Sequence, residues 1–286
     1  MSIKIVSDSS SNVFALEGVN YVTVPMKVIT GEKEYVDTPE LDVEGMVNDL
    51  KVYKGKSGSS CPNVQEWLDA FGDEDDIQGI TISRNLSGSY NSAQQAAAYI
   101  RENNPGRRVY IFDSLTAGPQ QIMAVEKMKE LILAGADFDT IVEKTNDYLL
   151  HSHILFCLES MNNLARNGRV NPAVAKIAGV LGIRACGDAP GGVIKPVHKP
   201  RGEKKATQVL LDMMVEKGLY DGALVRIAHC FGEKQANALK ELVLSRFPNC
   251  RFVLEPTGAL CSFYAEAGGL MIGFEGGFNA ANSKVQ

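Results

Sequence analysis

The feature that most constrains the fold is a repeated order of apolar run, polar turn and amphipathic stretch. Apolar runs at residues 3–7, 77–83 and 108–113 are each followed by polar residues and then by a helical pattern. Strands that alternate with helices in this way build a parallel sheet covered by helices. In such a sheet, ligands bind beyond the carboxyl ends of the strands. The first half therefore predicts an α/β/α domain with a binding edge.

Individual elements follow from local signals. We expect helices over residues 43–52 and 89–103, one that is capped by Asn63, and one that begins at Pro119. Asparagine is a favoured N-cap, and the fixed φ of proline suits the first helical position. Residues 21–29 are expected to form a single strand because apolar and β-branched side chains dominate there.

The second half continues the alternation of strand and helix. Two helical patterns lie between four strand candidates, at residues 193–197, 224–229, 251–254 and 270–274. With 286 residues, and about 150 residues per domain, the chain is expected to hold two domains. We place the parallel-sheet domain at residues 1–158 and a second α/β domain at 159–286.

Charge and hydropathy exclude several classes of protein. The chain has 29 basic and 34 acidic residues, and the basic residues form only short clusters near 199–201 and 204–205. A nucleic-acid binder would usually show a basic domain or stripe, so no nucleic-acid partner is expected. No uninterrupted apolar window of 18 residues predicts a membrane span, and residues 1–8 lack the apolar region of a signal peptide. We therefore expect a cytoplasmic protein.

The common motifs of cofactor and metal sites are missing. The sequence has no C-x-x-C pair, no G-x-G-x-x-G opening a helix, no G-x-S-x-G elbow and no H-E-x-x-H. Residues 55–57 read G-K-S, but Leu50 stands where a phosphate loop needs glycine. His151 and His153 are two apart, which does not place them on one helix face. His229 ends a strand candidate and is interpreted as a hydrogen-bonded core residue. No metal and no cofactor are expected.

What remains is a pair of hydroxyl-bearing loops, at residues 59–62 and 86–89. Each loop precedes a helix, so it combines serine O–H groups with free helical N–H groups, which suits a carboxylate or phosphate. Ser and Gly at these places also fit plain helix capping. Because both loops follow strands of one sheet, we expect them to meet at one edge and share an anion.

Several segments resemble the DegV family of bacterial fatty-acid-binding proteins. Residues 6–10 read V-S-D-S-S, similar to the opening V-T-D-S-T of that family, and residues 59–62 read S-S-C-P where the family has T-S-Q-P. The most specific match is I-S-R-N-L-S-G-S-Y-N-S-A at 82–93, which resembles I-S-S-x-L-S-G-T-Y-Q-S-A. Residues 163–170 are similar to L-x-K-G-G-R-I, and 194–202 to the K-P and K-x-R-G stretch. The resemblance spans nearly the whole chain.

The resemblance implies a function and a site. It implies a two-domain α/β fold with an apolar tunnel between the domains, in which a long-chain fatty acid lies. The fatty-acid carboxylate would be held by Ser59 and Ser87, with Ser60 and the Gly88 amide as neighbours. The family includes the binding subunits of fatty acid kinases, which present the carboxylate to a separate ATP-dependent kinase subunit for conversion to acyl phosphate, a step toward phospholipid synthesis. The chain itself would then carry no catalytic residue.

The sequence also departs from the family pattern. The family has a histidine in H-T-G-P-G near its C-terminus, where residues 264–268 read Y-A-E-A-G. Tyr264 therefore replaces the histidine; its O–H can donate to a carboxylate but cannot become cationic. We expect Tyr264 at the ligand, and Arg169 and Arg201 at the surface that docks the kinase.

Two alternatives remain open at this level. The chain could be an enzyme acting on a small carboxylated or phosphorylated metabolite, with Ser87 as nucleophile or His229 as base. It could also carry a different apolar acid, an alternative that Tyr264 and Glu266 suggest.

Overall fold

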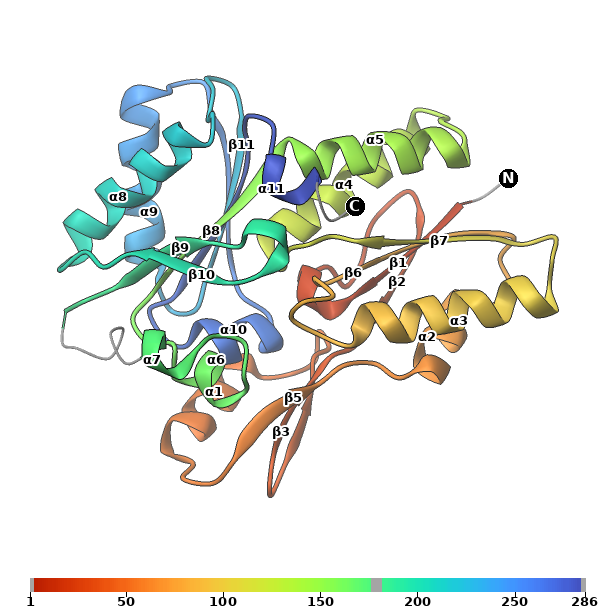
Figure 1. Cartoon of the computed structure of the whole chain (residues 1–286), viewed down its shortest axis with the longest axis horizontal. Coiled ribbons are helices and arrows are strands. Elements are labelled where there is room, and N and C mark those ends of the chain that lie inside the picture. The colour runs from red at the N-terminus through yellow and green to blue at the C-terminus, as the bar shows by residue number, and fades with distance from the viewer. Residues whose placement is uncertain (1–2, 176–181, 284–286) are drawn as a thin grey trace.

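The computed structural model describes residues 3–175 and 182–283, and it contains three sheets (Figure 1). The first sheet has the strand order β2-β1-β6-β7 and is parallel throughout. Its strands are β1 (Ile3–Asp8), β2 (Asn20–Val24), β6 (Asp76–Thr81) and β7 (Arg108–Asp113). The parallel sheet predicted for the first half is confirmed.

Helices cover both faces of this first sheet. On one face, α2 (Val64–Phe71) and α3 (Ser89–Asn103) bury Trp67 and Phe71 against the strands. On the other face lie α4 (Pro119–Leu133) and α5 (Phe138–Leu150). The apolar side chains fall at helical spacing on the sheet-facing sides, so burial of both sheet faces fixes this three-layer arrangement.

The single strand expected over residues 21–29 is wrong. Pro25 separates β2 from β3 (Lys27–Thr30), because proline has no N–H to continue the ladder. Strand β3 leaves the parallel sheet and forms a three-stranded antiparallel sheet with β4 (Glu34–Val36) and β5 (Ser57–Ser60). Helix α1 (Val43–Val52), which was predicted, connects β4 to β5.

The second half forms a mixed sheet of order β10-β9-β8-β13-β11-β12. Helices α8 (Glu203–Glu216) and α9 (Glu233–Arg246) pack on it over a buried aliphatic core. Its strands are β8 (Ser152–Leu158), β9 (Ala185–Asp188), β10 (Lys195–His198), β11 (Leu224–His229), β12 (Arg251–Pro256) and β13 (Leu270–Glu275). Shorter elements are the 3₁₀ turns η1 (Ser9–Ser11) and η2 (Pro190–Gly192), and the helices α6 (Asn162–Arg166), α7 (Pro172–Ala175), α10 (Ala259–Ala265) and α11 (Ala280–Ser283). The second α/β layer structure is confirmed.

The predicted domain boundary after Leu158 does not coincide with the boundary between sheets. Strand β8 pairs with β13 and β9, so by sheet membership it belongs to the second half. The strand follows α5 with one residue between them, which explains why no linker marks the change in the sequence.

Helix α4 contacts both large sheets, touching β1 and β6 on one side and β8, β11 and β13 on the other. The contact with β13 needs a glycine, because a Cβ atom on Gly273 would lie 2.7 Å from the backbone N of Gln120. The ion pair between Arg226 of β11 and Glu126 of α4, at 2.6 Å, spans the same contact. In the described part of the chain, no helix has both the length and the apolarity needed to cross a bilayer.

Candidate functional site

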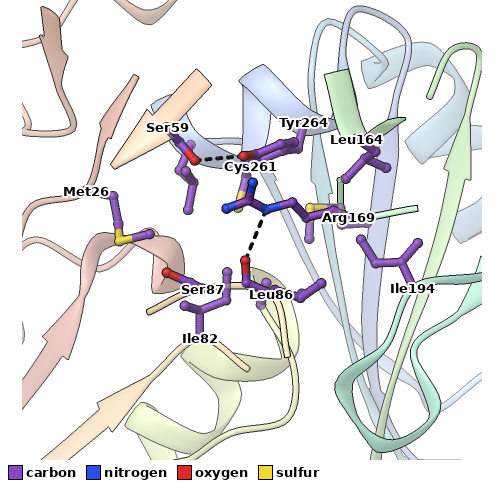
Figure 2. A pocket seen from close by; sticks show the side chains of 13 residues that line it. Met26, Ser59, Ile82, Leu86, Ser87, Leu164, Arg169, Ile194, Cys261 and Tyr264 are labelled. Carbon is purple, nitrogen blue, oxygen red and sulfur yellow. Dashed lines mark hydrogen bonds between the residues drawn. The ribbon is translucent and has the colours of Figure 1, made fainter. Parts of the chain in front are cut away.

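An apolar cavity lies between the two halves of the molecule (Figure 2). Its empty space, counted together with the open solvent at its mouth, is about 520 Å³. The first half contributes the side chains Met26, Ser59, Ile82, Leu86, Ser87 and Ala117, and the second half contributes Leu164, Arg169, Ile194, Leu260, Cys261, Tyr264 and Met271. The cavity is therefore formed only when both halves are in place.

A second apolar cavity, with about 500 Å³ of empty space counted in the same way, adjoins the first. The two share six lining residues, Leu86, Ala117, Leu164, Ile194, Tyr264 and Met271. The second cavity extends along β8 to Ile154, Phe156 and Leu158, which are buried. The two spaces together make one apolar channel. Ser59, Ser87 and Arg169 line only the first cavity and Tyr264 lines both, so we call the first cavity the polar end of the channel.

The polar end is built from opposite halves of the chain. The Ser59 hydroxyl, in β5, lies 2.7 Å from the Tyr264 hydroxyl, at the end of α10, and the two share a hydrogen bond (Figure 2). Ser59 is therefore in a strand and not in the loop that was predicted at 59–62. Ser60 is also in β5, and its hydroxyl donates to the Cys61 carbonyl instead of lining the cavity.

Ser87 lies in the loop between β6 and α3, as predicted, and it lines the cavity. Its hydroxyl accepts a hydrogen bond from the Ser89 N–H at 3.3 Å, so the residue also helps to cap α3. Gly88 is exposed, and a Cβ atom there would lie 3.2 Å from the sulfur of Cys61. The two hydroxyl-bearing segments thus approach each other, although one belongs to the antiparallel sheet and not to the parallel edge that we expected.

Arg169 is the residue whose place the sequence did not predict. It was expected at a docking surface, whereas its side chain lines the cavity between the Ser59–Tyr264 pair and Leu86 (Figure 2). Its Nε donates to the Leu86 carbonyl at 3.1 Å, and its guanidinium lies 5.8 Å from the centre of the Tyr264 ring. The Gly168 φ of +72° ends α6 and turns the next residue back toward the cavity. The sequence signal that could have indicated this turn is the run N-G-R at residues 167–169.

The other predicted residues lie elsewhere. Arg201 is exposed and belongs to an isolated bridge with Ile183. Glu266 accepts a hydrogen bond from the Asn163 N–H at 3.0 Å and does not line the cavity. His229 ends β11 outside the cavity; its Nδ1 is buried without a hydrogen-bond partner in the described residues, so the interpretation as a hydrogen-bonded core residue is wrong at that atom.

The remaining titratable groups do not assemble into a metal site. Burial lowers the pKa of His153 to about 4, and its Nε2 contacts the Gly277 carbonyl at 2.8 Å. Across residues 3–175 and 182–283, no group of three or more His, Cys, Asp or Glu side chains is arranged to hold a metal ion. The polar end offers hydroxyl and guanidinium donors, which recognise an anion.

Comparison with known proteins identifies the family. A family model described as "Uncharacterised protein, DegV family" matches residues 2–275. A DegV domain-containing protein of Streptococcus gordonii is 36% identical over 280 residues, which are 96% of this chain and 99% of the relative. The chain belongs to the DegV family.

Two solved DegV-family structures resemble this chain closely. The fatty acid kinase B3 protein of Streptococcus pneumoniae, loaded with linoleic acid, is 35% identical, with a TM-score of 0.93 over 96% of this chain and 99% of that one. A DegV family protein of Eubacterium eligens, loaded with heptadecanoic acid, is 34% identical, with a TM-score of 0.92 over 96% of this chain and all of that one. The predicted DegV-like α/β fold is confirmed.

Proposed function

We propose that this DegV-family chain binds a long-chain fatty acid in the channel and presents its carboxylate to a separate ATP-dependent kinase subunit. The observation that carries the proposal is the polarity of the channel. Its walls are apolar, and Ser59, Ser87, Tyr264 and Arg169 gather at one end. A ligand with one anionic end and a long apolar tail is the chemical class that fits this division.

The expected binding free energies agree with a ligand that has an apolar tail and one anionic end. Each buried methylene contributes about 0.8 kcal/mol, so most of the affinity comes from the tail. Hydrogen bonds to a charged group contribute about 1.5–3 kcal/mol each, so the polar end fixes the direction in which the ligand lies. The carboxylate would accept from the Ser87 hydroxyl, from the free proton of the Ser59–Tyr264 pair and from the Arg169 guanidinium.

The carboxylate end is partly accessible from outside. Ser59, Ser87 and Arg169 are only partly buried, whereas Leu158 and Phe156 along the other cavity are buried. A phosphoryl group could therefore approach the carboxylate from outside. Under this proposal the kinase supplies ATP and metal, this chain supplies no catalytic group, and both proteins act in the cytoplasm. The exposed Arg201 contributes to the docking surface, whereas Arg169 faces the ligand carboxylate.

Lipid extraction of the purified full-length chain tests the first part of the proposal. Protein expressed in a bacterial host should release about one fatty acid per chain, identified by mass spectrometry. Absence of fatty acid, together with tight binding of a small polar carboxylate or phosphate, would favour an enzyme. Release of another class of apolar acid would favour a different cargo.

A further inference from the structure

The polar run that follows β1 has no role in the site described so far. Ser9, Ser10 and Ser11 form η1, and together with Asp8 all four side chains are buried. A second buried carboxylate, Asp37, follows β4 and joins the same region through the Ser9 hydroxyl at 2.9 Å. Burying a charged carboxylate costs free energy unless hydrogen-bond donors surround it. The groups that donate to each carboxylate therefore indicate its role.

Asp8 holds both ends of the loop that carries Ser87. Its Oδ2 accepts from the Ile82 N–H at 3.0 Å and from the Ser89 hydroxyl at 2.6 Å. Its Oδ1 accepts from the Gln121 side-chain amide at 3.0 Å. Ser87 lies in the sequence between Ile82 and Ser89, which both donate to Oδ2. The Asp8 carboxylate therefore fixes the position of the Ser87 hydroxyl.

Asp37 holds Tyr264 opposite Ser59. Its two oxygens accept from the N–H groups of Ala259, at 2.8 Å, and Leu260, at 3.3 Å, which open α10. Tyr264 stands in the last turn of that helix. On the other side, the Asp37 N–H donates to the Met26 carbonyl at 2.9 Å, immediately before β3, which pairs with the strand of Ser59. Asp37 therefore links the two partners of the Ser59–Tyr264 pair, with its carboxylate on α10 and its backbone N–H on the segment before β3.

Neither carboxylate forms an ion pair with a basic side chain of the described residues. Burial raises the pKa of both, and the charge of Asp8 raises that of Asp37 further. A carboxylate offers acceptors at both oxygen positions, whereas an asparagine amide keeps one acceptor and would turn its NH₂ group toward the donors at the other position. The identity of the two residues, and not only their size, is therefore needed.

On this basis, and resting on the proposed function, we propose that Asp8 and Asp37 are positioning residues for the ligand carboxylate: Asp8 sets the Ser87 loop, and Asp37 sets Tyr264 against Ser59. Neither residue lines the channel, so neither touches the ligand. The specific consequence is that their loss weakens recognition of the head group while the apolar tail still binds.

The test compares two ligands that differ only in the head group, hexadecanoic acid and hexadecan-1-ol, on the delipidated full-length chain. Asp8→Asn and Asp37→Asn should each lower affinity for the acid by about tenfold, the equivalent of one lost charged hydrogen bond. Affinity for the alcohol should change less than about twofold. Ser89→Ala and Ser9→Ala, which remove one donor to each carboxylate, give the same direction if the asparagine variants do not fold.

The control is Asp76→Asn. Asp76 is also buried and accepts two bonds from Arg108 at 2.7 Å, but it begins β6 at the opposite end of the strand from the Ser87 loop. It should leave both affinities unchanged. Equal losses for acid and alcohol would show a merely structural role and overturn the inference, as would unchanged affinity for the acid. If the wild-type chain binds no acid, the proposed function fails, and the inference fails with it.

Discussion

Ser59 and Tyr264 show how two neutral side chains can recognise an anion. The two hydroxyls carry two protons, and one proton is used in the bond between them at 2.7 Å. The second proton remains available to a ligand oxygen, and the Arg169 guanidinium near the Tyr264 ring adds the positive charge. Tyrosine in place of the family histidine thus keeps a donor, while the charge comes from arginine.

Replacing Tyr264 by phenylalanine should remove that donor and keep the ring. We expect Tyr264→Phe to weaken fatty-acid binding about tenfold, because one hydrogen bond to a charged group is lost. A binding titration with hexadecanoic acid measures the change. Tyr90→Phe is the matched control, since the Tyr90 hydroxyl accepts a hydrogen bond from the Gln94 side chain at 2.7 Å and does not line the channel. Unchanged affinity in Tyr264→Phe would remove the hydroxyl from the site.

His153 should make stability depend on pH. Burial lowers its pKa from 6.5 to about 4, with smaller contributions from Lys217 and His151, which lower it, and from Asp188 and the Gly277 carbonyl, which raise it. The folded state therefore favours the neutral ring. Its stabilising contribution is complete above the unfolded pKa and is lost as pH falls from 6.5 toward 4.

The loss over that range should reach about 3 kcal/mol, since one pKa unit corresponds to about 1.4 kcal/mol. Denaturant unfolding of wild type and His153→Gln, measured across the range, gives the difference between their free energies of unfolding. That difference should narrow as the pH falls. Parallel curves for the two proteins would contradict the assignment. The control is His198→Gln, which changes an exposed side chain.

At this scale the sequence predicted part of the site. The loops that carry Ser59 and Ser87 stood out because hydroxyls before a helix suit an anion. The family resemblance then singled out these two serines, and both line the cavity. Arg169 was expected at a docking surface, because no local pattern tells which way a side chain after a helix turns. Asp37 was missed, since its backbone donors, the N–H groups of Ala259 and Leu260, lie more than 200 residues away in sequence.

At the scale of helices and strands, prediction succeeded where the residues of an element are themselves enough to determine its structure. Helix α3 spans Ser89–Asn103 and α1 spans Val43–Val52, as expected. It failed at β5, which reads S-G-S-S and has little intrinsic strand preference. That strand exists because it pairs with β3, a partner 27 or more residues earlier whose own position depended on Pro25.

The N-terminus of α2 gives a test at this scale. Asn63 and Glu66 form a capping box, with bonds of 3.0 Å and 2.7 Å between each side chain and the backbone of the other. Asn63→Ala should lower the free energy of unfolding by about 1 kcal/mol. Fatty-acid affinity should stay unchanged because α2 does not line the channel. Chemical denaturation measures the first quantity; a loss below about 0.3 kcal/mol would mean that water replaces the cap.

For the whole molecule, the α/β layers followed from periodicity, but the channel did not. Its lining residues, such as Leu164 and Ile194, look like core residues in any apolar count, because composition does not separate packed from open surfaces. Only the family resemblance pointed to a tunnel between the domains. The cavity depends on how two sheets meet, which is not a local property of the chain.

A larger side chain inside the channel should weaken ligand binding without preventing folding. Ala117 lines both cavities, so Ala117→Phe would place a ring where they join. We expect at least a tenfold loss of fatty-acid affinity, with stability of the delipidated protein changed by about 1–3 kcal/mol at most. Thermal shifts report this directly: hexadecanoic acid should raise the melting temperature of wild type and not of the variant. An equal shift in both would place the ligand elsewhere.

Helix α4 has a mechanical consequence. Because α4 contacts both large sheets, it is part of the packing of both halves. Swinging the halves apart like a hinge would strip apolar surface from α4 and break the Arg226–Glu126 pair. Helix α4 lines neither cavity, so we expect it to act on the channel by holding the spacing of the two sheets, and we expect a ligand to enter and leave by local rearrangement at the rim. The rate of ligand exchange would then depend on a few segments at the edge of the channel, with the distance between the sheets unchanged.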